Sequence, residues 1–528
     1  MPISFSNIPA NLRVPLYWVE VDPSKAGLPV IRQPALLTGT MIDAEGDATP
    51  NVPIAIGTQA QADARFGQGS ELACMFQAFF ANNFANEVWG LPFAEPVGGV
   101  AASAEIDITA APTEAGTIHL YIGGEHVGIN VVPTMTTAEV ATAIKDAINL
   151  LPDLPVVADT STSPAMVTLT CNWKGIGGND IDLRLNYYGK LGGEETPIGL
   201  TLVIPTALSG GTGTPDPSTG ITNLGEKTFE YVAIPFTDST TLNAWDYEYG
   251  FSDNGRWGWR RQLFGHCFSA KRDTYSNLVT FGPTRNSGTM SIMAVEPESP
   301  SPVYKWVSAY VAKAQRALTN DPARPLQTLA LESILPAPLE HRFQLPEINT
   351  LAYYGLATQM TKDGGIAPII SRESTTYQLN LYGFGDDAYE LVTTLATLAR
   401  LLRNQRHAIT TKFPRHKLAN DGTRFGPGQA IVTPGIIKAE LIAQYRQDEY
   451  NGLVEDTRNF KRHLLVERDP NDPNRANILY PPDLINQLRI FAVLAQFRLQ
   501  YDRGIDVEII GQSGLTGITA RGPGPGAF

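Results

Sequence analysis

The sequence has few residues for thiol or thiolate–metal chemistry. Only three cysteines, Cys74, Cys171 and Cys267, occur among 528 residues, and they lie far apart. There is no Cys-x-x-Cys pair and no zinc-finger spacing, which argues against a cysteine-ligated zinc site. We therefore expect three reduced core thiols in a protein that is assembled in a cytosol.

Long hydrophobic runs and an excess of positive charge are also missing. No segment reaches the length of a membrane-spanning helix, and the opening MPISFSNIPANLRVP has no apolar core of a secretory signal. We therefore expect a soluble chain without membrane insertion. The formal net charge of −13 argues against bulk affinity for nucleic acid or anionic membranes.

Catalytic motifs are absent as well. The sequence contains no His-Glu-x-x-His, no Gly-x-Ser-x-Gly and no Walker loop. His266 beside Cys267 is the nearest approach to a base and nucleophile, but adjacent strand residues point to opposite faces. The acidic pairs at 386–387 and 194–195 are interpreted as a helix N-terminal turn and a solvated loop. We expect no enzyme, no catalytic residue, no metal site and no cofactor.

A glycine-rich stretch, WKGIGGNDIDLRL at residues 173–185, allows three interpretations. A phosphate loop is disfavoured because Asn179 and Asp180 stand where lysine and a hydroxyl are needed. A calcium repeat is disfavoured because such repeats bind in arrays and a second copy is missing. Apolar residues alternate over 167–171 and again over 181–187, so the stretch predicts a hairpin.

The length predicts about three or four domains. The composition changes near residue 97, and 98–212 is predicted to be a small α+β domain inserted into another. It contains a hairpin around Gly123-Gly124 and a helix that begins with a capping box of Thr136 and Glu139. The sequence GGTGTPDPSTG is predicted to close this domain as a flexible linker.

The other periodic segments divide between strands and helices. The strands are predicted at 16–21, 35–39, 52–56, 88–91, 200–204, 229–236, 459–467, 485–501 and 505–510. The helices are predicted at 71–84, 239–249, 303–318, 386–406 and 434–450. The fold class is a multidomain α+β or α/β protein. Its core is a mixed sheet flanked by helices, with the inserted β-rich domain and extended arms at both termini.

One local charge pattern stands out on this acidic chain. No carboxylate occurs between Glu390 and Asp421. The basic residues of this stretch are Arg400, Arg403, Arg406, Lys412, Arg415 and Lys417, together with His407 and His416. Two interpretations stay open: a solvated helix end, because cations favour helix C-termini, or a docking face for an acidic protein partner.

Three segments resemble the Mu-like bacteriophage tail sheath family. They are ISFSNIPANLRVPLYWVEVD at the start, GGNDIDLRLNYY in the inserted domain, and LLVERDPNDPNRANILYPPDLINQLRIFAVLAQFRLQY near the end. The resemblance extends over essentially the whole chain, in the same order.

This resemblance implies a structural subunit of a contractile tail sheath. Such subunits form stacked hexameric rings around a tail tube and contract to drive the tube through the host envelope. The energy is stored in subunit packing, so no nucleotide or cofactor is consumed. The implied partners are further copies of the chain, the tail tube protein, and baseplate and tail terminator proteins. The implied place is the virion tail, assembled in the host bacterial cytoplasm.

The family pattern suggests a division of the chain. In this division the arms are residues 1–24 and 502–528. The core consists of 25–97 and 213–501, and its part 300–501 lies closest to the tube. The outward domain is 98–212, and GIGGND lies in one of its surface hairpins. The arm residues predicted to pair with neighbouring subunits are Leu16, Tyr17, Trp18, Val19, Val21, Ile505, Val507 and Ile509. The basic stretch is predicted to face the tube.

Two other classes are weighed against a sheath. One is a virion-surface tail enzyme or adhesin that binds or cleaves polysaccharide, which would favour repeats and an acidic cleft. The other is a static tube or baseplate component. The shape of the purified protein's assemblies in electron micrographs discriminates between these classes.

Overall fold

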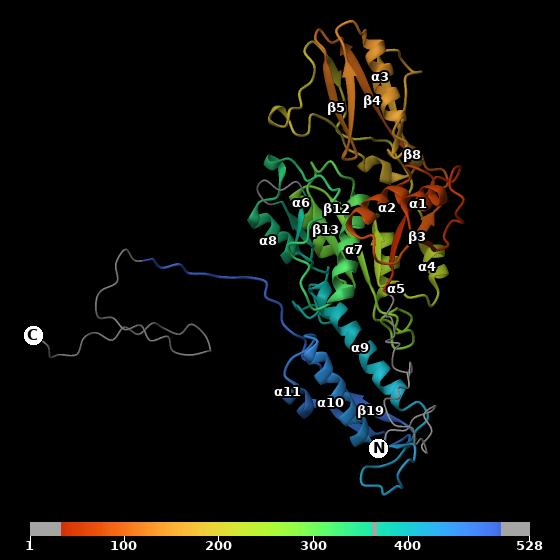
Figure 1. Ribbon diagram of the computed structural model, residues 1–528, viewed down its shortest axis with the longest axis vertical. Helices are drawn as coiled ribbons and strands as arrows, with labels where there is room; N and C mark the ends of the chain where they lie inside the picture. The colour runs from red at the N-terminus through yellow and green to blue at the C-terminus, as the bar shows by residue number, and fades with distance from the viewer. Residues whose placement is uncertain (1–32, 362–366, 498–528) are drawn as a thin grey trace, which may run out of the picture. The chain divides into compact units, whose positions relative to one another are not determined.

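The computed structural model describes residues 33–361 and 367–497. Over these residues the protein is a mixed α/β chain with several sheets and eleven helices (Figure 1). Of these described residues, those up to Ile485 form one compact unit, and Asn486 begins a second. The predicted arm strands at 16–21 and 505–510 lie outside the described residues.

The central element is a six-stranded sheet in the order β13-β12-β11-β1-β3-β2. All neighbouring pairs are parallel except β2 with β3. Its strands are β1 (Ala35–Thr40), β2 (Ile54–Ile56), β3 (Val88–Phe93), β11 (Tyr231–Ile234), β12 (His266–Arg272) and β13 (Met290–Val295). Strands β1, β11 and β13 are buried along their whole length, as expected for a parallel sheet that is covered on both faces.

Helices cover both faces of this sheet. On one face, α1 (Gln59–Phe66), α2 (Glu71–Asn82) and α7 (Val303–Asn320) share a hydrophobic cluster with alternate residues of β1, β11 and β12. The opposite face packs against α4 (Ser218–Leu224), α5 (Ser239–Tyr249), α6 (Tyr275–Phe281) and α8 (Leu345–Tyr353). The helices predicted at 71–84, 239–249 and 303–318 are confirmed, with small shifts at their ends.

The segment 98–212 contains two sheets and one α-helix. The first sheet has the order β10-β4-β8-β7, and the second β6-β5-β9. Their strands are β4 (Ala101–Ala110), β5 (Gly116–Ile122), β6 (Glu125–Val131), β7 (Val156–Asp159), β8 (Met166–Lys174), β9 (Leu183–Leu185) and β10 (Thr201–Val203). The hairpin β5–β6 and the capping box of α3 (Thr137–Asn149) are confirmed.

The hairpin predicted from the two alternating runs around GIGGND is wrong. Strand β8 pairs with β4 and β7, whereas β9 pairs with β5 in the other sheet. A short 3-10 helix, Ile176–Asp180, joins them. Alternation tells which face of a strand is apolar but does not tell which strand lies beside it, so the faces were predicted and the pairing was not.

The glycines of this stretch permit close packing in the interior. A Cβ on Gly178 would lie 2.9 Å from the Cys171 Sγ atom. A Cβ on Gly177 would lie 2.5 Å from the Glu71 Oε1 atom of α2. The stretch therefore packs against the interior, contrary to the surface hairpin that the family resemblance suggested.

The predicted flexible linker at 210–220 is also wrong. The Val100 N–H donates to the Thr212 carbonyl at 3.2 Å, and the Ile176 N–H donates to the Gly213 carbonyl at 2.9 Å. The Asn179 side-chain amide donates to the Gly211 carbonyl at 2.9 Å. Backbone pairing thus fixes the return of the chain, and its last residues begin α4.

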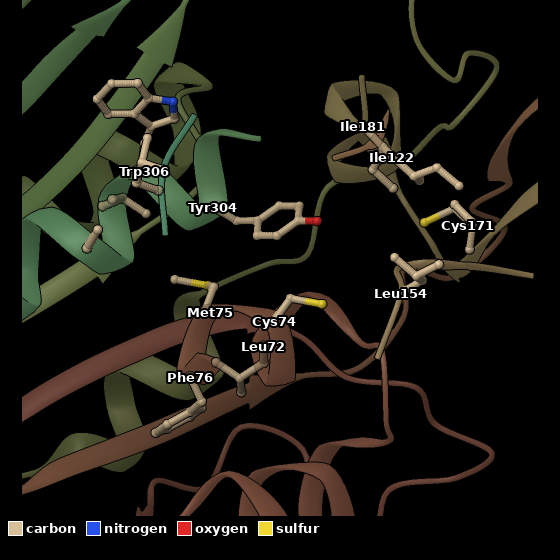
Figure 2. Close-up of a cluster of buried hydrophobic side chains, with 14 of the residues drawn as sticks. Leu72, Cys74, Met75, Phe76, Ile122, Leu154, Cys171, Ile181, Tyr304 and Trp306 are labelled. Carbon is tan, nitrogen blue, oxygen red and sulfur yellow. The ribbon is translucent and has the colours of Figure 1, made fainter. Parts of the chain in front are cut away.

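The segment 98–212 shares a buried cluster with the central sheet. Figure 2 shows Cys171 and Ile181 of this segment near Cys74 of α2 and Tyr304 of α7, and all four belong to one cluster. Ion pairs join the same regions: Asp180 with Arg272 at 2.6 Å, and Glu125 with Lys305 at 2.5 Å. The Asp180 carboxylate also accepts the Val303 N–H at the start of α7, where negative charge is favourable.

The rest of the first unit consists of helices and small ribbons. The helices are α9 (Val392–Lys412), α10 (Pro434–Tyr450) and α11 (Thr457–His463). The ribbons are β14 (Thr358–Met360) with β15 (Ile369–Arg372), β16 (Lys417–Leu418) with β17 (Ile431–Val432), and β18 (Leu465–Arg468) with β19 (Ala476–Leu479). The helix predicted at 434–450 is confirmed. The strand predicted at 459–467 is wrong in its first part, because Asp456 caps α11 through the Asn459 N–H.

Helix α9 begins and ends later than the predicted 386–406. The chain before it is held extended, because the Thr375 N–H donates to the Glu390 carbonyl and the Val392 N–H to the Glu373 carbonyl. The acidic pair at 386–387 is therefore not in a helix N-terminal turn. In the second unit, residues 486–497 contain no helix or strand, so the strand predicted at 485–501 is not seen in its described part.

Candidate functional site

The basic residues of the 391–420 stretch divide into an inward group and an exposed group. Arg400 and Arg403 belong to the inward group. The Arg400 guanidinium donates to the Thr319 carbonyl at the end of α7, at 2.9 Å. Arg403 forms the stronger contact, a charge-assisted pair with Glu230.

Arg403 contacts the Glu230 carboxylate, the Phe264 ring and, at 3.3 Å, the Leu263 carbonyl. Its two terminal nitrogens each donate to one Glu230 oxygen, and the Nη1–Oε1 distance is 2.9 Å. The guanidinium carbon lies 5.3 Å from the centre of the Phe264 ring, which adds a cation–π contact. The side chain is 17% exposed and that of Glu230 only 4%. In this conformation the Arg403 guanidinium contacts residues of its own chain and is not available to bind a partner.

The exposed group lies at the end of α9 and in the segment after it. Lys412 pairs with Glu440 of α10 at 2.5 Å. Arg406, Arg415 and Lys417 are exposed, and across the described ranges none of them forms an ion pair. The loop that follows, residues 421–430, is exposed throughout and adds Arg424. These residues form a basic surface, defined here as Arg406, Lys412, Arg415 and Lys417.

The buried side of α9 holds this surface in place. Leu401 belongs to a cluster with Ile437, Leu441 and Tyr445 of α10. The Asn404 amide donates to the Asp448 carboxylate at 2.7 Å. The helical spacing of Leu391, Leu395, Leu398 and Leu402 predicts one buried stripe, and this prediction is only partly right. The buried residues of α9 are Val392, Thr393, Leu395, Thr397, Ala399, Leu401 and Ala408, while Leu398 and Leu402 are only half-buried.

The candidate base and nucleophile do not form a catalytic pair. Cys267 lies in the cluster on one face of the central sheet, whereas the His266 ring packs on Phe268 of the other face, at 5.0 Å. Burial lowers the pKa of His266 to about 3 and raises the pKa of the Cys267 thiol well above its usual range. Near neutral pH the imidazole is therefore uncharged and the thiol protonated, as in structural core residues.

The interpretation of the acidic pair at 194–195 as a solvated loop is right for Glu195 and wrong for Glu194. Glu195 is exposed and pairs with Lys190 at 2.6 Å. Glu194 is buried, and its carboxylate accepts hydrogen bonds from the Tyr121 hydroxyl and the Tyr188 N–H. No sequence pattern indicates this burial, because Tyr121, which donates to Glu194, lies 73 positions away in the hairpin β5–β6.

Two family models match the chain. The phage tail sheath protein central domain matches residues 210–376, and the phage tail sheath C-terminal domain matches residues 385–498. The Mu-like prophage FluMu tail sheath protein of Haemophilus influenzae is 43% identical over 501 residues, which is 94% of this chain and 100% of the relative.

The chain belongs to the phage tail sheath family. It is therefore a contractile phage tail sheath subunit, a structural protein and not an enzyme. Among the helices that the structure describes, none combines the length and apolar composition needed to cross a bilayer.

Solved sheath structures are also similar to this sheath chain. The sheath tail protein from Desulfitobacterium hafniense has 11% identity and a TM-score of 0.44, covering 89% of this chain and 100% of its own. The helical sheath of the anti-feeding prophage in its contracted state has 9% identity and a TM-score of 0.43, covering 93% of this chain and 100% of its own. Since both TM-scores are below 0.5, family membership rests on the sequence comparisons.

Proposed function

We propose that the protein polymerises as stacked hexameric rings around a tail tube and shortens to push the tube through the host envelope. The extended sheath is a kinetically trapped state, and contraction releases free energy stored in the packing of its subunits. Its partners are further copies of itself, the tail tube, and baseplate and tail terminator proteins. Assembly takes place in the bacterial cytoplasm, without nucleic acid or membrane insertion.

The observation that carries this proposal is the exposure of apolar side chains in the second unit. Between residues 490 and 497 the described chain contains no helix or strand, and its large apolar side chains are exposed. They are Ile490, Phe491, Val493, Leu494 and Phe497, each between 78% and 86% exposed. Exposed apolar groups of this extent mark interaction sites, and an isolated extended segment has no stability of its own.

A neighbouring subunit supplies the missing partner. We expect this segment and the arm strands around 16–21 and 505–509 to pair with the sheet of an adjacent copy. A connection of this kind keeps subunits linked while rings rotate and slide past one another. A rigid interface between two faces would have to break during the same motion.

The division of the chain into domains is part of the proposal. Residues 25–97 and 213–501 form the core, with 300–501 nearest to the tube, and 98–212 face outward. Two observations support the boundary near residue 212. The match to the central-domain family model begins at residue 210, and the end of the segment 98–212 lies beside its start, where the Val100 N–H donates to the Thr212 carbonyl.

The basic surface of Arg406, Lys412, Arg415 and Lys417 is proposed to face the tube. A sheath has to hold the tube when extended and release it when the wall widens. Exposed charge pairs suit this task, because each contributes only about 0–1 kcal/mol and the attraction is screened beyond about 8 Å at physiological salt. An apolar contact would stabilise the bound state by about 25 cal/mol per Å² and would make release costly.

Truncation tests the proposal directly. Variants that lack residues 1–21, or that end after Arg503, should remain folded monomers in size-exclusion chromatography and circular dichroism, and should form no tubes in electron micrographs. A double substitution, Phe491→Ser with Leu494→Ser, should have the same effect. Long tubes from any of these variants would contradict the exchange of strands between subunits.

A further inference from the structure

Three side chains of the segment 98–212 bring metal-binding atoms together. Across the described ranges of the chain, His119, His126 and Glu194 form the group whose donor atoms all lie within 4.8 Å of one another. The His119 Nδ1 atom lies 3.0 Å from the His126 Nε2 atom and 3.9 Å from the Glu194 Oε1 atom. None of these residues belongs to the basic surface or to the arms.

Strand register explains why the two imidazoles meet. His119 lies on β5 and faces Gly128 across the ladder, whereas His126 on β6 faces Tyr121. Both histidines are therefore on one face of the hairpin, opposite to the buried Ile118 and its alternate neighbours. Gly128 has no side chain to separate the rings, which stack with centroids 5.2 Å apart.

The carboxylate comes from the loop between β9 and β10 and is held in place. Glu194 is 7% exposed, its Oε1 accepts the Tyr121 hydroxyl, and its Oε2 accepts the Tyr188 N–H at 2.9 Å. A buried carboxylate is costly without a positive partner. Among the described residues, the ion pair recorded for Glu194 is with His119, which is charged only when protonated. A bound cation would supply this positive charge.

We propose that His119, His126 and Glu194 bind a divalent transition metal ion, zinc in particular. Two imidazoles and one carboxylate are a ligand set that zinc takes in proteins, with a water molecule in the fourth position. Ligand atoms at about 2.0–2.2 Å from zinc lie roughly 3.3 Å apart in a tetrahedron, close to the 3.0 and 3.9 Å separations found here.

The surroundings fit the outer shell of such a site. Tyr121 donates to Glu194, and this bond orients the carboxylate toward the histidines. Outer-shell hydrogen bonds of this kind typically change metal affinity by about 10- to 100-fold. The ion would join the hairpin β5–β6 to the loop of Glu194, two parts of the segment 98–212 that are distant in sequence. Its role there is to fix that loop and not to support catalysis.

Cobalt and zinc titrations of the untagged full-length protein, stripped of metal with a chelator, test the proposal. Co²⁺ should produce a visible d–d absorption band with one ion per chain, and Zn²⁺ should abolish the band by displacement. Zn²⁺ should also raise the Tm. His126→Asn and Glu194→Gln should lose the band, while Tyr121→Phe should weaken binding by about 10- to 100-fold.

His341→Asn is the matched control, because His341 is an exposed histidine outside the cluster. It should bind the metal like the unsubstituted protein. His126 is exposed, so its replacement should leave the metal-free circular dichroism spectrum and Tm unchanged. The proposal is overturned if the unsubstituted protein gives no cobalt band, or if His126→Asn binds Co²⁺ as tightly as the His341→Asn control.

Discussion

Arg403 of α9 and Glu230, the residue before β11, lie 173 positions apart and form a two-point ion pair. The Glu230 backbone also belongs to the sheet, since its N–H donates to Pro34 and its carbonyl accepts the His266 N–H. The pair therefore ties the long helix to the central sheet. Because of this pair, Arg403 belongs to the inward group of basic residues and not to the basic surface at the end of the helix.

Removing Arg403 should destabilise the subunit. Arg403→Ala leaves the Glu230 carboxylate buried without its partner, and breaking such a pair costs about 3–5 kcal/mol. The free energy of unfolding, measured by urea denaturation, should fall by this amount. Arg406→Ala is the control, because Arg406 is exposed and its replacement should change stability by about 0.5 kcal/mol or less. A cost below about 1 kcal/mol for Arg403→Ala would contradict the structural role.

The glycine-rich stretch provides a second test. Gly178→Ala places a methyl group 2.9 Å from the Cys171 Sγ atom and 3.0 Å from the Ala102 Cβ atom. Overpacking of this kind costs about 1–3 kcal/mol, which should appear as a lower Tm. Gly426→Ala has open space around its Cβ and should leave the Tm nearly unchanged. Equal Tm values for the two variants would mean that this stretch is not packed as described.

These two cases show what the sequence could and could not predict. Periodic apolar patterns and caps predicted β1, β2, β3 and β11 of the central sheet, α5, α10 and the capping box of α3, because such patterns report on local structure. They did not predict β12 and β13. The partner of β8 and the ion-pair partner of Arg403 depend on segments far away in sequence. No local pattern contains that information, and this is why the hairpin predicted at GIGGND was wrong and the roles of Arg403 and Glu194 were missed.

The buried His266 predicts a specific pH dependence. Its pKa is lowered from 6.5 to about 3 by burial, so between these values the unfolded chain binds a proton that the folded chain does not. Stability should therefore be lost as the pH falls below 6.5, at up to about 1.4 kcal/mol per pH unit. Relative to His266→Leu, the protein should lose about 2 kcal/mol between pH 7 and pH 5. His341→Leu is the control, and the unsubstituted protein should show no such loss relative to this variant. An equal loss relative to both variants would contradict the role assigned to His266.

Charge reversal on the basic surface tests the proposed contact with the tube. Arg406→Glu, Arg415→Glu and Lys417→Glu together should leave the unfolding free energy within about 1 kcal/mol, because these side chains are exposed. Empty sheath polymers should form as before. Co-sedimentation with purified tail tubes should decrease, and binding by the unsubstituted protein should weaken as the salt concentration rises.

A control for this experiment changes the same number of charges elsewhere. Lys190, Arg260 and Arg475 are exposed bases in other segments, and their joint replacement by glutamate should leave co-sedimentation unchanged. If the two triple variants bind tubes equally well, the basic surface is not the tube-binding face.

Electron microscopy of the purified protein tests the central claim most directly. A sheath subunit that polymerises through its own extended segments should form hollow tubes of stacked hexameric rings without any other component. Removing residues 1–21 should abolish these tubes and leave folded monomers. Compact particles from the unsubstituted chain, trimers for example, under conditions where the protein is folded and concentrated would contradict the account.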